Sequence, residues 1–192
     1  SKQKWAYGTP GLDLFLTVSA NACRGSFSQD GRHWTVVGAK LYELDLTAVT
    51  ATVIGDVTND GFPVSFTSNG DGGSQLGVVG GGNLYVLDLV SGVYSQVTLP
   101  FLNAVMIVFQ DGYGLINEAN TPTVWFSTLE DLTIWDALDF FSRSGTSDNL
   151  VGLAVTRDRV WVIGSKTTTQ YYDSGDADNP WAPYPGTTIQ VG

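Results

Sequence analysis

The sequence contains very few of the residues that catalysis and metal binding usually require. It has one cysteine, Cys23, and one histidine, His33, among its 192 residues. A single cysteine excludes an internal disulfide, and a single histidine removes most zinc sites and most mechanisms with a histidine base. We therefore expect Cys23 to be a small buried residue on a strand, and His33 to occupy a surface or edge position in a hairpin.

Basic residues are also scarce. Nine Lys and Arg stand against 19 Asp and Glu, which gives a formal net charge of −10 at pH 7. Affinity for DNA comes largely from Lys and Arg side chains that neutralise phosphates. The tightest basic pair, Arg157 and Arg159, flanks Asp158. We therefore expect no sequence-specific nucleic-acid partner, and an acidic surface that repels DNA.

Long hydrophobic runs are absent. The longest uninterrupted apolar run, Ala104 to Phe109, is far below the length that spans a bilayer. No signal peptide is visible, so we expect no membrane partner. The chain begins at Ser1 rather than at a methionine, which favours a processed or excised piece.

The residues that are abundant favour an all-β protein. Glycine occurs 23 times, aromatic residues make up 12% of the chain, and charged residues only 15%. Glycine supplies the positive φ angles of tight turns, and aromatic and β-branched residues favour strands.

A six-residue motif occurs twice. Leu-Tyr-Glu-Leu-Asp-Leu at 41–46 returns as Leu-Tyr-Val-Leu-Asp-Leu at 84–89. Weaker echoes follow at Trp125 and Tyr171, so aromatic anchors recur every 40 to 46 residues or so, near the length of a propeller blade. The repeat predicts an all-β, β-propeller-like fold of about four blades of antiparallel strands. It does not decide between a complete and an incomplete propeller. The rival fold is a β-sandwich of short hairpins.

The repeat divides a single predicted domain, 1–192, into units of about 22–60, 61–100, 101–149 and 150–192. Ahead of them, Leu12 to Val18 is expected to be a strand that completes another blade. The less regular Leu129 to Phe141 is expected to hold a helical turn before Trp135. Asp173 to Pro185 is expected to be a long loop, with Thr187 to Val191 as the last outer strand.

Motifs for catalysis are missing. No nucleophile elbow or phosphate loop is present. Four aspartates are candidates for paired-carboxylate hydrolysis, namely Asp111, Asp136, Asp139 and Asp158. Asp111 and Asp158 occupy matching turns between the first two strands of their units, which indicates turn formation. We therefore expect no enzyme activity.

One further pattern indicates a structural role, and two are candidates for binding. Ser28 to Trp34 resembles the Asp-box of sialidase-like propellers, one residue short, and such boxes are structural hairpin locks. Asp173, Asp176 and Asp178 are loosely spaced for calcium but lack the glycine and distal glutamate of a known loop, so calcium is only a weak candidate and no cofactor is expected. Trp181 and Tyr184 are candidate sugar or interface contacts.

Several short sequences then follow one another in a fixed order: Thr9–Leu12, Val37–Tyr42, Trp135–Phe140, Ser147–Val151, Trp161–Thr168, Tyr171–Gly175 and Pro185–Gly186. Together they resemble the packaged-DNA stabilisation proteins of short-tailed phages, the podovirus-type family of head-completion or tail-hub proteins. The resemblance covers nearly the whole chain, although members of that family are about twice as long. Trp135, in the third of these sequences, is a further candidate interface contact.

The resemblance implies a β-propeller-like structural virion protein that seals the portal and stabilises packaged DNA in the phage neck or tail, after assembly in the host cytoplasm. It implies a homo-oligomeric ring in contact with the portal or adaptor and with the tail needle or other tail proteins. It implies no catalytic residue. The alternative function is a glycan- or receptor-binding β-propeller module.

Overall fold

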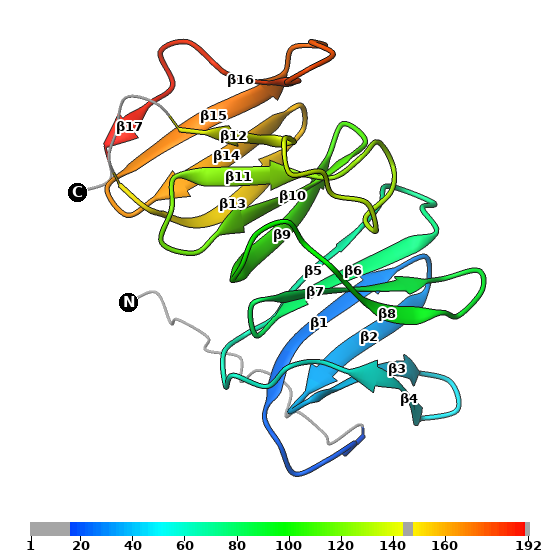
Figure 1. The fold of residues 1–192 in the computed structure, drawn as a ribbon. Helices are drawn as coiled ribbons and strands as arrows, with labels where there is room; N and C mark the ends of the chain where they lie inside the picture. Colours follow the sequence, from blue (N-terminus) through cyan, green and yellow to red (C-terminus); the bar gives the residue numbers. More distant parts are fainter. Residues whose placement is uncertain (1–15, 144–147, 191–192) are drawn as a thin grey trace, which may run out of the picture.

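The computed structural model describes residues 16–143 and 148–190 (Figure 1). They form 17 β-strands in antiparallel sheets. No helix that could cross a membrane occurs among these residues.

The first two sheets each contain four strands that pair in chain order. The first sheet consists of β1 (Cys23–Gln29), β2 (Arg32–Val37), β3 (Lys40–Asp45) and β4 (Thr50–Asp56). The second consists of β5 (Ser65–Ser68), β6 (Gln75–Gly80), β7 (Asn83–Asp88) and β8 (Tyr94–Val97).

The last two sheets repeat this order with small additions. The third consists of β9 (Ala104–Gln110), β10 (Tyr113–Glu118), β11 (Thr123–Phe126) and β12 (Phe140–Ser142). The fourth consists of β13 (Leu150–Thr156), β14 (Arg159–Gly164), β15 (Thr167–Asp173) and β16 (Trp181–Pro183), and β17 (Ile189–Gln190) also pairs with β15.

The sheets are arranged as successive blades of a propeller. The first strands of neighbouring sheets lie against one another, because β1 contacts β5, β5 contacts β9, and β9 contacts β13. Figure 1 shows the blades following one another from the first at the bottom to the fourth at the top. The predicted all-β propeller of about four blades is therefore confirmed, and the arrangement is an open arc rather than a two-layer sandwich.

Because every sheet is a simple up-and-down meander, the strand ends of all four sheets lie along two opposite sides of the arc. At the side that we call the turn end, the first strand of each sheet turns into the second, and the third into the fourth. Hydrogen bonds join neighbouring blades there, for example from Gln29 Nε2 to the Gly70 carbonyl (3.0 Å) and from Gln110 Nε2 to the Arg157 carbonyl (2.7 Å). The opposite end, which we call the linker end, holds the connections from blade to blade.

The aromatic anchors of the repeat all lie on the third strand of their sheets, Tyr42 on β3, Tyr85 on β7, Trp125 on β11 and Tyr171 on β15. Tyr85, Trp125 and Tyr171 each pack into the apolar layer shared with the preceding blade. The leucine that precedes the anchor in the repeat faces the other way, so Leu41 and Leu84 pack against the following blade.

The aspartate of each repeat shapes the turn that follows it. Asp45 Oδ1 accepts hydrogen bonds from the backbone N–H groups of Thr47 and Ala48, both at 2.8 Å. Asp88 accepts the equivalent pair from Val90 (2.9 Å) and Ser91 (2.7 Å). In both cases these donors lower the carboxyl pKa below its ordinary value. The repeated strand is scaffold, and its aspartate serves the turn between the third and fourth strands.

The predicted turn role of Asp111 is confirmed. In the β9–β10 turn, Asp111 and Gly112 have φ angles of 49° and 86°. Asp30 and Gly31 adopt the same conformation in the β1–β2 turn, with φ angles of 50° and 75°. Two consecutive positive φ angles are typical of the tight hairpin turn that Asp-Gly favours.

Two local predictions are wrong. Cys23 lies on a strand but is exposed. Leu129 to Phe141 contains turns and the short strand β12 rather than a helical turn. A third prediction, the strand over Leu12 to Val18, lies mostly outside the described residues and stays a prediction there; its described part, 16–18, forms no strand.

The outer strand of the fourth blade also differs from the prediction. It is β16, which lies inside the segment expected to be a loop, and β17 contributes only a short pairing at the other end of β15. The chain reverses because Asp176 Oδ1 accepts hydrogen bonds from the backbone of Asp178 (2.9 Å) and Asn179 (3.1 Å). Trp181 is thereby brought back to pair with Asp173.

Tyr94 provides a test of packing between the first two blades. Its ring stacks on Tyr85 with centroids 5.9 Å apart, and its hydroxyl donates to the Asp56 carbonyl at 2.9 Å. Gly55 lies so close to the ring that a Cβ there would overlap it. Burial raises the pKa of Tyr94, and Tyr85 and Asp56 raise it further.

We expect Tyr94→Phe to change how stability depends on alkaline pH. Because the folded state holds the phenolic proton more tightly than the unfolded chain, the stability contributed by Tyr94 is complete below the ordinary tyrosine pKa of about 10 and is lost as pH rises above it. Urea unfolding from about pH 9 to 11 should therefore show a shallower loss of stability in the variant. Equally steep curves for the two proteins would refute this expectation.

Candidate functional site

Trp181, expected on an exposed loop, is buried. Its side chain is 3% exposed and belongs to the apolar layer between the third and fourth blades. The ring meets Tyr113 edge-on at 6.2 Å and lies 6.3 Å from Phe141. Exposure of Trp181 was therefore wrongly predicted, because the turn at Asp176 returns the chain to the sheet. The tryptophan presents no open ring face to a sugar.

Tyr184 is exposed but its ring is already in contact with other side chains. It is 42% exposed, and it meets Tyr172 edge-on at 5.8 Å. The guanidinium of Arg159 lies 4.3 Å from the Tyr184 ring centroid. An interface role for Tyr184 stays a prediction.

Trp135 anchors a long loop rather than projecting from it. It is 9% exposed within the apolar layer between the second and third blades, and its Nε1 donates to the Leu132 carbonyl at 2.8 Å. Leu132 is fully buried in the same layer. Both residues belong to the connection 127–139 between β11 and β12, which we call the anchored loop.

Side chains of the second blade fix the anchored loop further. Gln75 donates from Nε2 to Asp131 Oδ1 at 3.0 Å, and its Oε1 accepts from the Leu132 backbone at 2.7 Å. Asn69 Nδ2 donates to the Glu130 carbonyl at 2.9 Å. The loop is therefore held by hydrogen bonds on one side and by buried side chains beneath it.

Despite this anchoring, the loop keeps three large apolar side chains in solvent. Leu129 is 61% exposed, Ile134 53% and Leu138 82%. Glu130 and Asp136 are exposed beside them in the chain. Sequence reasoning missed these residues, because the alternation that identifies core positions on a strand does not apply to an irregular loop.

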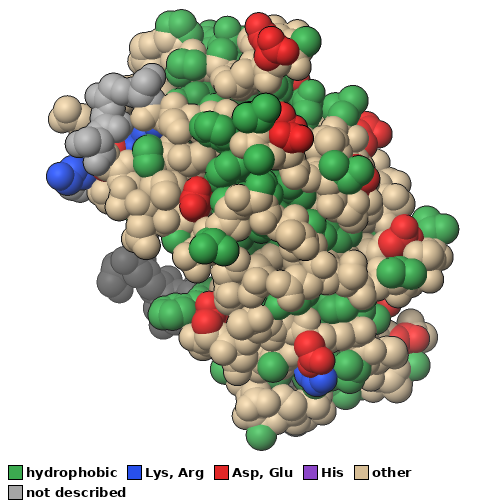
Figure 2. Space-filling model, viewed as in Figure 1, with side chains coloured by type: hydrophobic (Ala, Val, Ile, Leu, Met, Phe, Trp, Pro, Cys, Tyr) green, Lys and Arg blue, Asp and Glu red, His purple; other side chains and the backbone are tan. Residues whose placement is uncertain are grey.

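Charge is distributed unequally between the two ends of the arc. The carboxylates in the turns and loops of the turn end are Asp30, Asp45, Asp71, Asp88, Asp111, Glu130, Asp131, Asp136, Asp139, Asp158, Asp173, Asp176 and Asp178. The basic residues beside them in the described chain are Arg32, Arg157 and Arg159. Figure 2 shows acidic side chains along the right-hand side of the molecule, where these loops lie, interspersed with hydrophobic ones.

At the linker end, acidic and basic residues of the described segments are equal in number. Its acidic residues Asp56, Asp60, Glu118 and Asp148 are matched by Arg24, Lys40, Arg143 and Lys166. Ion pairs join Arg24 to Asp60, Lys40 to Asp56, and Arg143 to Asp148. The negative field of the protein is therefore concentrated at the turn end.

Carboxylates crowd where the third and fourth blades meet at the turn end. Burial raises the pKa of Asp139, and Asp136 raises it further. Burial likewise raises the pKa of the Tyr113 phenol, followed by the charges of Asp173 and Asp139. Tyr113 therefore lies near carboxylates of both the third and the fourth blade.

The aspartates considered for calcium serve their own loop. Asp173 Oδ1 accepts from the Gly175 backbone at 2.8 Å, and Asp176 caps the turn described above. Within 16–143 and 148–190, no three His, Cys, Asp or Glu side chains are placed to hold a metal ion.

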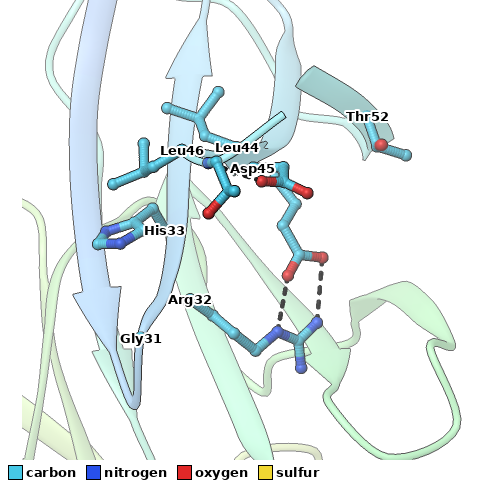
Figure 3. A pocket seen from close by; sticks show the side chains of 9 residues that line it. Gly31, Arg32, His33, Leu44, Asp45, Leu46 and Thr52 are labelled. Carbon is cyan, nitrogen blue, oxygen red and sulfur yellow. Dashed lines mark hydrogen bonds and ion pairs between the residues drawn. The ribbon is translucent and has the colours of Figure 1, made fainter. Parts of the chain in front are cut away.

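A polar pocket of about 470 Å³ lies beside the turn that resembles an Asp-box (Figure 3). Arg32 lines this pocket, but its guanidinium already donates two hydrogen bonds to the Glu43 carboxylate, at 2.7 and 3.0 Å, and a third to the Leu89 carbonyl at 3.2 Å. His33 shares a hydrogen bond of 2.7 Å with Ser28. The contacts of Arg32 join β2 to β3 and to the second blade. They leave its guanidinium little capacity to bind an anion.

Fold and surface together define a β-propeller protein whose most distinctive described feature is the set of acidic and apolar loops at the turn end. Similar solved structures include the computationally designed Ika4 protein (14% identity, 82% of this chain and 94% of that chain, TM-score 0.55). Others are the extracellular domain of the one-component system BT4673 from B. thetaiotaomicron (14%, 93% and 23%, TM-score 0.61) and U3-55K (11%, 92% and 55%, TM-score 0.61). At these identities the likeness shows the fold alone.

The family follows from the sequence. No curated protein matched the chain. The model of the phage stabilisation family, described as "Bacteriophage P22 Gp10, beta-propeller", matches residues 2–192. The chain belongs to this family, as its sequence predicted, and is a structural protein of a bacteriophage.

Proposed function

We propose that the chain is part of the hub that seals the portal of a short-tailed phage and stabilises its packaged DNA. The family match over residues 2–192 carries this proposal. In this role the protein is a non-enzymatic component of the neck or tail, assembled in the host cytoplasm. Several copies form a ring that contacts the portal or adaptor on one side and the tail needle or other tail proteins on the other.

The fold supports a mechanical role, because buried polar contacts tie the blades together. Arg24 is 7% exposed, and its guanidinium donates to the carbonyls of Gly38 (3.1 Å), Thr58 (2.8 Å) and Phe62 (2.7 Å). It therefore joins the first blade to the connection that leads into the second. Such satisfied networks make a stiff unit, as a plug under DNA pressure requires.

The charge of the turn end suits a passage for DNA. Carboxylates repel phosphates, so DNA that passes this surface does not adhere to it. We expect no measurable binding of double-stranded DNA even at low salt, tested by fluorescence anisotropy. Tight binding at low salt would overturn this part of the proposal.

We expect the purified chain to protect DNA in phage heads that lack it. DNA-filled heads of the parent phage would be incubated with the chain and treated with DNase, and the protected fraction measured. Native mass spectrometry of the same sample should show a multimer. Unchanged protection would contradict the sealing role, whereas a strict monomer would contradict only the ring.

A further inference from the structure

The anchored loop combines exposure with rigidity. Single exposed leucines are ordinary on protein surfaces, but Leu129, Ile134 and Leu138 lie on one loop and are highly exposed. Trp135 and Leu132 beneath them are buried, and Gln75 bonds both the side chain of Asp131 and the backbone of Leu132. A loop that is already ordered loses little conformational entropy when a partner binds it.

The charged side chains of the anchored loop itself all have one sign. Glu130 and Asp136 are exposed on the same loop, and the loop contains no Lys or Arg. Asp111 is exposed in the β9–β10 turn, whose Gly112 lies against Leu129, whereas Asp158 in the next blade is paired with Arg159. A partner that covers the leucines must therefore also face carboxylates.

We propose that the anchored loop is a docking surface for a protein that presents an apolar pocket rimmed by Lys and Arg. The leucine and isoleucine side chains would fill the pocket, and the carboxylates would pair with its rim. This inference goes beyond the portal-sealing role and does not depend on it.

Charge argues against the other occupants. DNA and RNA would bring phosphates against carboxylates. A second copy of the chain offers no clustered basic patch in its described residues. Five of its basic side chains are already ion-paired within the chain, namely Arg24, Arg32, Lys40, Arg143 and Arg159, and the other two, Arg157 and Lys166, lie at opposite ends of the blades. A basic surface on a different protein is the occupant that fits.

The chemistry can be tested with a short synthetic helical peptide built only of leucine and lysine. A second peptide has glutamine in place of leucine and the same charge. Isothermal titration calorimetry with the full chain should show at least about tenfold tighter binding of the leucine peptide, because only that peptide covers the apolar side chains. Equal affinities, or no binding of the leucine peptide, would overturn the proposal.

Variants then locate the binding surface. Leu138→Ser should weaken binding of the leucine peptide about tenfold, and Asp136→Asn should weaken it about threefold with a shallower salt dependence. The matched control is Leu102→Ser, because Leu102 is 77% exposed in the β8–β9 connection of the linker end. Circular dichroism confirms that each variant is folded. An equal effect of the Leu102 and Leu138 variants would refute the assignment.

The outcome is independent of the DNA-protection assay. Loss of peptide binding in Leu138→Ser with DNA protection retained supports the docking surface separately from sealing. Binding of double-stranded DNA to the chain alone, without peptide, that Leu138→Ser weakens would overturn the proposal, because it would place phosphates on the same acidic surface.

Discussion

Replacing Asp148 by asparagine is expected to lower the free energy of unfolding by about 3 to 5 kcal/mol, more than any exposed charge substitution in the chain. Asp148 and Arg143 form an ion pair whose side chains are 3% and 1% exposed. The pair lies in the connection from the third blade to the fourth. An asparagine there leaves the Arg143 charge buried without its counter-ion.

Asp148 also binds the backbone of the fourth blade, which enlarges the expected loss. Its Oδ2 accepts hydrogen bonds from the N–H groups of Lys166 (2.8 Å) and Thr167 (2.9 Å). Arg143 in turn donates to the Thr167 carbonyl at 2.6 Å. The two side chains together fix the start of β15, and Gly164 lies so close to both that a Cβ there would overlap them.

The matched control for this prediction is Asp56→Asn. Asp56 pairs with Lys40 at 2.5 Å, but the two side chains are 78% and 46% exposed. Solvent and salt screen such a pair, so its loss is expected to cost less than about 1 kcal/mol. Urea unfolding followed by tryptophan fluorescence measures both variants. Similar midpoints for the two would show that the buried pair has no special weight.

A double variant separates the charge from the backbone contacts. Arg143→Met with Asp148→Leu removes both charges and keeps apolar volume, and such replacements of buried ion pairs are often neutral. Here the N–H groups of Lys166 and Thr167 would still lose their acceptor. We therefore expect the double variant to recover part of the stability lost in Asp148→Asn, but not all of it.

The blades were predictable because their signal is local and periodic. Tyr42 and Tyr85 stand at the same place in two near-identical strands, and each motif aspartate makes the same two hydrogen bonds in the turn that follows. Asp-Gly at 111–112 predicted its turn because that dipeptide tolerates two positive φ angles. These features need no knowledge of the tertiary structure.

The candidate site was much less predictable, because burial in loops depends on contacts far apart in the sequence. Trp181 is covered by Tyr113 and Phe141, which belong to the preceding blade. The anchored loop is fixed by Gln75, more than fifty residues earlier. The concentration of carboxylates at the turn end was not predictable either, because it depends on the sheet topology, which places alternate turns on the same side.

The second large effect is expected at the repeated leucines. Leu41 and Leu84 are both fully buried, and each packs against the following blade. Truncation of such a side chain to alanine removes apolar contacts and leaves a cavity, which costs about 2 to 5 kcal/mol. The last leucine of the first motif, Leu46, is 45% exposed, so Leu46→Ala should cost less than about 0.5 kcal/mol.

The two buried leucines should nevertheless differ in how the protein unfolds. Each blade of the open arc packs mainly against its neighbours, as in a linear repeat protein, so the stability of a blade depends mainly on the interfaces that it shares with them. Leu41 supports the interface of the first blade, at one end of the arc, whereas Leu84 supports the central interface between the second and third blades. Leu41→Ala should therefore allow the first blade to unfold early and lower the apparent urea m-value, because the transition is no longer two-state. Leu84→Ala should shift the midpoint of the main transition instead. Identical unfolding curves for the two variants would show that the arc unfolds as one cooperative unit.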